Sequence, residues 1–183
     1  MASKQIKINS LRASYPHLFS PDKMAEKYTC TFIIQKTAPA VAELKAALNE
    51  VYKAAVAENP GKTIAHDLLK AGDIEKAADQ IYAGCYFFKA KTGFDSIKDN
   101  VFKRTPMGVV KITDESEFYA GCNCSALVTI KDYDFNGKRG LHFLLEAVCR
   151  EEGGEPLSAG SSNHAAAFGD EAEAAPAPSD DIF

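Results

Sequence analysis

Residues 120–134 and 139–149 are two β-rich runs on either side of the dipeptide Asn136-Gly137. Asn-Gly best fits the two positive φ angles of a type I′ turn, and such a turn holds its flanking strands antiparallel. Residues 5–14, 26–36 and 84–91 also have strand character, because apolar and polar side chains alternate along the last two of these runs. The sequence therefore predicts about five strands, two of them joined in a tight hairpin.

One helix is predicted over residues 39–58, where Pro39 suits the first turn and Asn59-Pro60-Gly61 ends the element. Its apolar residues follow helical spacing: Val41, Leu44, Leu48, Val51, Tyr52 and Ala55. Residues 64–81 predict one or two short helical turns, and residues 92–117 a long connection. Five strands and one principal helix are typical of a mainly β fold, either a small barrel or a strongly bent sheet with a helix packed against it.

The composition fits one domain with an appendage. At 183 residues and 46% apolar content the chain can bury a core, which excludes collagen, a coiled coil and a wholly disordered chain. No apolar run is long enough to span a bilayer, and the N-terminus lacks the hydrophobic stretch of a secretory signal. Five scattered cysteines suit reduced thiols better than a disulfide framework. We therefore expect a soluble cytoplasmic protein with no membrane partner.

Charge is divided unevenly along the chain. All 21 Lys and Arg lie within residues 1–150, which hold 17 of the 25 acidic residues, so this body carries about +4 and residues 151–183 carry −8. Such a division is typical of a nucleic-acid-binding body with an acidic tail, and equally of a soluble protein whose end is merely solvated.

The final segment, residues 158–183, is rich in Ala, Ser, Glu, Asp and Pro, a composition predicted to be disordered. It ends in two acids followed by two large apolar residues, namely Asp180, Asp181, Ile182 and Phe183. An apolar tip on a negatively charged tether predicts a partner-docking peptide.

Catalytic and metal motifs are weak. Gly61-Lys62-Thr63 resembles the end of a phosphate-binding loop, but Val56 stands where that loop needs glycine. Cys122 and Cys124 are too close together for a zinc knuckle and have no second pair of ligands. No histidine is spaced as a base for a nucleophile. We therefore expect no enzyme activity, no cofactor and no metal.

Aromatic and basic residues alternate on three segments. They are Phe87, Lys89 and Lys91; Lys131, Tyr133 and Phe135 with Lys138 and Arg139; and Phe102, Lys103 and Arg104. Rings beside cations let unpaired bases stack while their phosphates are neutralised, without preference for sequence. The alternative interpretation is that the rings belong to the core and the cations to a solvated face.

Several blocks carry a family resemblance. The runs 84–91, 112–122, 136–140 and 154–157, followed by an acidic tail, resemble the single-stranded DNA-binding proteins of tailed bacteriophages, relatives of phage helix-destabilising proteins. The resemblance implies a five-stranded OB-fold barrel over residues 1–157 and a disordered acidic tail over residues 158–183. It also implies that Lys89, Lys91, Tyr119, Tyr133 and the Lys138-Arg139 pair line the DNA groove.

We therefore expect sequence-independent binding of single-stranded DNA during phage replication, recombination and repair in the bacterial host cell. The tail is expected to recruit a polymerase, helicase or nuclease and to compete with DNA, and a homodimer is allowed. Two alternatives stay open: an RNA-binding OB module of cold-shock type, and an acidic adaptor that binds proteins through its tail.

Overall fold

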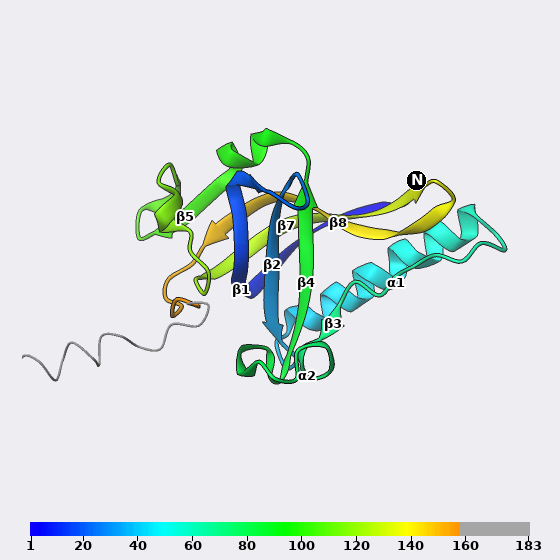
Figure 1. The fold of residues 1–183 in the computed structure, drawn as a ribbon, viewed down its shortest axis with the longest axis horizontal. Coiled ribbons are helices and arrows are strands. Elements are labelled where there is room, and N and C mark those ends of the chain that lie inside the picture. The colour runs from blue at the N-terminus through cyan, green and yellow to red at the C-terminus, as the bar shows by residue number, and fades with distance from the viewer. Residues whose placement is uncertain (158–183) are drawn as a thin grey trace, which may run out of the picture.

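Five strands close into a barrel in the computed structural model, which describes residues 1–157 (Figure 1). The barrel strands are β1 (Ser3–Asp22), β2 (Lys27–Gln35), β4 (Cys85–Thr92), β7 (Asn123–Phe135) and β8 (Lys138–Arg150). Neighbouring strands pair antiparallel, except that β4 and β8 meet in parallel at the closure. The predicted five-stranded OB-fold barrel is confirmed. The predicted tail, residues 158–183, lies outside the described residues.

The other elements extend or cover this barrel. They are α1 (Ala40–Glu58), β3 (Lys70–Ala71), α2 (Gly72–Glu75), β5 (Val101–Thr105), β6 (Gly108–Lys111) and the 3-10 turns η1 (Gln80–Tyr82), η2 (Asp95–Asn100) and η3 (Glu115–Glu117). β3 extends the sheet beyond β4, whereas β5 and β6 extend it beyond β8. Within residues 1–157, no helix is both long and apolar enough to cross a membrane.

Alternate residues of the barrel strands point inward and form the core. The rings of Phe32, Phe88 and Phe143 pack in series, with centroids 5.5 Å and 4.7 Å apart. Helix α1 lies against β1 and β7 and buries one face: Val41, Leu44, Ala47, Val51 and Ala55. Since inward positions fill the core, the intervening positions of each strand face outward, where Thr29 and Ile33 of β2 are still buried but Lys89 and Lys91 of β4 are exposed.

Most predicted elements are confirmed. Helix α1 occupies nearly all of 39–58, and α2 and η1 are the short turns expected within 64–81. Asn136 and Gly137 have φ angles of 51° and 76°, as a type I′ turn requires. The long connection predicted over 92–117 was wrong, because it folds into the β5–β6 hairpin and two 3-10 turns. Strand β6 is exposed on both faces, so it lacks the alternation that reveals a strand.

Residues 151–157 form a C-terminal strap across the outside of the barrel. The strap is held by hydrogen bonds to its own backbone. The Arg12 guanidinium donates to the Glu155 carbonyl oxygen at 2.8 Å, and the Tyr119 hydroxyl donates to the Gly154 carbonyl oxygen at 2.8 Å. The Leu157 amide donates to the Ala120 carbonyl oxygen at 2.7 Å. Gly121 lets it approach closely, because a Cβ there would lie 2.0 Å from the Glu155 carbonyl oxygen.

Gly121→Ala is expected to lower the free energy of unfolding by about 2–4 kcal/mol. The new methyl group would collide with the strap, and φ at Gly121 is +104°, which disfavours any L side chain. Urea denaturation measures the change. Gly93→Ala is the matched control, with nothing within 4 Å of its Cβ and an expected change below about 0.5 kcal/mol. Equal losses in the two variants would contradict this packing.

Candidate nucleic-acid interface

The outward side chains of β2 and β4 form a surface that we call the β2–β4 face. The strands pair in register, with Thr29 opposite Lys91, Thr31 opposite Lys89 and Ile33 opposite Phe87. Their neighbours Cys30, Phe32, Phe88 and Ala90 are buried in the barrel. β2 and β4 are the second and third strands of the barrel, and in OB-folds the face of these two strands is where oligonucleotides bind.

Three lysines from three strands lie close enough to the half-buried His142 of β8 for their charges to act on it. Lys27 lies on β2, Lys91 on β4 and Lys131 on β7, and their positive charges all act on the imidazole. Burial and these three charges lower the pKa of His142. We call Lys27, Lys91 and Lys131 the lysine cluster. None of the three forms an ion pair within residues 1–157, so their charges are available to an anion.

The β7–β8 hairpin adds exposed aromatic rings beside the lysine cluster. Phe135 is 69% exposed at the hairpin tip, and Tyr133 is 37% exposed. The Tyr133 ring lies against His142, with centroids 5.8 Å apart, and crosses Gly140. A Cβ on Gly140 would come within 2.8 Å of the Tyr133 hydroxyl, so glycine lets the ring lie flat on β8. These two rings are not part of the core.

The remaining predicted residues near this surface are more constrained. Phe87 is half-buried and packs edge-on against Tyr82 at 5.1 Å. Lys89 is half-exposed on the same face and lies 3.8 Å from Asp22. At the hairpin tip, Lys138 is exposed, whereas Arg139 is paired with Asp134 at 2.5 Å.

The third predicted segment, made of Phe102, Lys103 and Arg104, lies at the opposite end of β8. β5 pairs with the end of β8 farthest from the hairpin, with Phe102 opposite Cys149 and Lys103 opposite Arg150 (Figure 1). The Lys103 ammonium is paired with Glu117, and Arg104 with Glu151 at 2.6 Å. The eight residue steps along β8 from His142 to Arg150 span roughly 26 Å. The structure therefore does not bring this segment to the lysine cluster.

Tyr119 also belongs to this distant group. Its hydroxyl donates to the strap, and the Arg150 guanidinium covers its ring at 5.1 Å from the centroid. Phe102 is half-buried as well. Tyr119 therefore has structural partners and Phe102 is partly covered, in contrast to the open rings of the hairpin.

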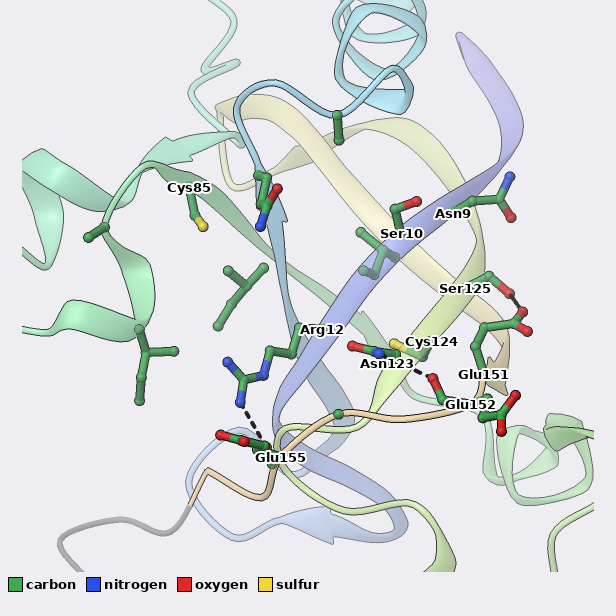
Figure 2. A pocket seen from close by; sticks show the side chains of 17 residues that line it. Asn9, Ser10, Arg12, Cys85, Asn123, Cys124, Ser125, Glu151, Glu152 and Glu155 are labelled. Atoms are coloured by element: carbon green, nitrogen blue, oxygen red, sulfur yellow. Dashed lines mark hydrogen bonds between the residues drawn. The ribbon is translucent and has the colours of Figure 1, made fainter.

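A depression of about 920 Å³ lies between β1, the start of β7 and the strap (Figure 2). Its rim includes the carboxylates of Glu151, Glu152 and Glu155. Among residues 1–157, Arg12 is the one cation that lines it, and its guanidinium donates to the carbonyl oxygens of Gly121 and Glu155. The glutamate carboxylates would repel phosphate, and the arginine is already hydrogen-bonded to the protein, so this depression is a poor DNA site.

The cysteines are free thiols, and four of the five are buried. Burial raises the pKa of the Cys122 thiol to about 11 and also raises the pKa of Cys124. Thiols of this kind are unreactive side chains of the core. Among residues 1–157, no group of three His, Cys, Asp or Glu side chains is placed to hold a metal ion.

The family model described as "Enterobacter phage Enc34, ssDNA-binding protein" matches residues 4–178. The chain belongs to this family. The match spans the barrel and continues into the acidic segment beyond the strap. No curated protein sequence matches the chain significantly.

Solved structures of two phage proteins have the same fold. The Enc34 single-stranded DNA-binding protein in complex with ssDNA is 19% identical, with a TM-score of 0.69 over 84% of this chain and 89% of that one. The structure of the Enc34 protein alone is 20% identical, with a TM-score of 0.68 over 90% of this chain and 89% of that one. The single-stranded DNA-binding protein gp2.5 of bacteriophage T7 is 20% identical, with a TM-score of 0.56 over 97% of this chain and 100% of that one. The family's OB-type barrel is thus shared across distant sequences.

Sequence reasoning missed Lys27 and His142. Lys27 begins β2 and approaches the site only because the barrel closes. His142 could have been found, because a two-residue turn at Asn136-Gly137 places it opposite Lys131 in the hairpin register.

Proposed function

We propose that this member of the family binds single-stranded DNA without sequence preference, on the β2–β4 face and the adjoining β7–β8 hairpin. The observation that carries the proposal is that unpaired lysines from three strands converge beside exposed rings. The proposed contacts are Lys27, Phe87, Lys89, Lys91, Lys131, Tyr133, Phe135 and Lys138. Phosphates would lie among the lysines while bases stack on the hairpin rings. This is a binding role in phage replication, without catalysis.

Fluorescence anisotropy with labelled oligonucleotides tests this function. At low salt, we expect oligothymidine and a mixed-sequence single strand to bind with similar affinity, and the matched duplex to bind much more weakly. Failure to bind any single strand would contradict the proposal and favour the adaptor role. Tighter binding of a matched RNA than of DNA would favour the RNA-binding alternative.

The acidic segment 158–183 is proposed to compete with DNA for this face. Leu157, which ends the strap, packs against the cluster of Ile33, Tyr82 and Cys85, and Phe87 packs against the same cluster. The segment therefore starts beside the β2–β4 face. It contains five acids and no Lys or Arg. A short tether gives an effective concentration on the order of millimolar, enough for weak contacts to compete.

Deleting residues 158–183 is expected to raise the affinity for oligothymidine about 3- to 10-fold at low salt, with a smaller effect at high salt because screening weakens the competitor. Anisotropy titrations at several salt concentrations measure both effects. Full-length protein with the five tail acids changed to Asn or Gln is the matched control and should behave like the truncation. Unchanged or weaker binding of both proteins would refute tail competition.

The apolar tip of the segment is the proposed site for replication and recombination proteins. Asp180 and Asp181 would steer Ile182 and Phe183 into a pocket rimmed by basic residues on a polymerase, helicase or nuclease. Phe183→Ala should abolish capture of such a partner while leaving DNA binding unchanged. Loss of both activities would refute a separate docking role.

A further inference from the structure

His142 has an unsatisfied ring nitrogen in the middle of the proposed interface. Its Nδ1 is buried and has no hydrogen-bond partner within residues 1–157, where Asp132 Oδ1 is the one other side-chain atom in this condition. Buried polar atoms are rarely left without a partner, and such an exception calls for an explanation. His142 lies directly opposite Lys131 in the hairpin, and its ring packs at a steep angle against Tyr133, with centroids 5.8 Å apart.

The charges that face His142 come from three other strands. Lys27 of β2, Lys91 of β4 and Lys131 of β7 oppose a positive imidazole, and Asp132 of β7 is the one acid that favours it, with the smallest effect of the four. The phenol of Tyr133 completes the surroundings. Burial is the largest influence, and together with the lysines it holds the pKa of His142 below its ordinary value. In the free protein the imidazole is therefore neutral at pH 7.

Binding of DNA would reverse this balance. Phosphates placed among the three lysines would cancel the repulsion that adds to burial in disfavouring the charged imidazole, and their own charge would favour an imidazolium. We infer that His142 becomes the fourth cation of the DNA interface, taking up one proton from solvent as the strand binds. The inference rests on the proposed function and adds a proton to its binding equilibrium.

Linkage sets the sign of the effect. A group whose pKa rises on binding makes the complex more stable as pH falls, until the pH passes below the pKa of the free protein. The affinity changes at most tenfold for each unit by which the two pKa values differ. Of the ionisable groups in proteins, histidine and the terminal amine have ordinary pKa values between pH 5.5 and 8, so a histidine variant isolates the effect sought here.

The test is the affinity of full-length protein for oligothymidine at constant salt between pH 5.5 and 8. We expect binding to tighten about 3- to 10-fold from pH 8 to pH 6, and His142→Gln to abolish this pH dependence. His66→Gln is the matched control, because the His66 ring packs against Tyr52 of α1 and its Nδ1, unlike that of His142, already has a partner in the Ile64 carbonyl oxygen at 3.1 Å; it should retain the full pH dependence. Equal pH profiles for the unmodified protein and His142→Gln would overturn the inference and leave the DNA-binding function intact. Absence of binding at every pH would instead refute the function.

A direct readout avoids any doubt about the folding of the variant. NMR titration of the His142 ring protons should give a pKa below about 6.5 in the free protein and a higher value in the oligothymidine complex. The same pKa in both states would also overturn the inference.

Discussion

Replacing Lys27, Lys91 and Lys131 together by glutamine is expected to weaken binding of oligothymidine about a hundredfold at 0.1 M salt. Each phosphate neutralised on a single strand contributes about 0.7 to the slope of log K against log salt, so losing three contacts should flatten that slope by about two units. Because no ion pair within residues 1–157 involves these lysines, the substitution should scarcely affect stability. Anisotropy titrations over a range of salt measure both quantities.

A matched triple variant shows whether position matters as well as charge. Lys103, Arg104 and Lys111 are each already paired with an acid, respectively Glu117, Glu151 and Asp99. Changing these three cations to glutamine removes the same formal charge but should weaken binding less than about threefold. If both triple variants lose affinity equally, the DNA is held by overall charge and not by the lysine cluster.

The second large effect is expected from the hairpin rings. Changing Tyr133 and Phe135 together to alanine should remove about 2–6 kcal/mol of binding free energy, because each stacked base contributes about 1–3 kcal/mol. The salt slope should stay the same, since no phosphate contact is lost. Anisotropy measures affinity, and circular dichroism checks that the barrel is intact. A loss of fold would instead support the interpretation of these rings as core.

A conservative change at the tip provides the positive control. The chain contains no tryptophan, so Phe135→Trp introduces a single tryptophan, which can be excited selectively over tyrosine, at the most exposed ring of the hairpin. We expect this variant to bind as tightly as the unmodified protein, with its fluorescence quenched by oligothymidine through stacking. Binding without any change in emission would show that position 135 does not touch the bases.

The barrel could be predicted from the sequence because local patterns determine it. Alternation marks β2 and β4, helical spacing marks α1, and Asn136-Gly137 sets the register of the β7–β8 hairpin. The β5–β6 hairpin could not be predicted in this way. β5 is held by a parallel pairing with the distant β8, and β6 is supported only by β5, so neither depends on a periodic pattern of its own.

The site was only partly predictable for the same reason. Lys131 and Tyr133 share a face by strand alternation, which the sequence shows. Lys91 joins them only through the short β4–β8 pairing that closes the barrel, and nothing local signals that contact. Conversely, Arg104 looks like a free cation in the sequence but finds its partner Glu151 47 residues away. Aromatic and basic patterns therefore identified the chemistry but not which segments act together.

The central claim is that an unpaired strand lies across the β2–β4 face and the β7–β8 hairpin. Photo-crosslinking with an oligothymidine that carries 5-bromodeoxyuridine, followed by peptide mass spectrometry, tests it most directly. Adducts are predicted on the peptides that contain Phe87, Tyr133 and Phe135, and none on the peptide that contains Phe102. Adducts confined to Phe102 and Tyr119, with the hairpin unmodified, would contradict the claim.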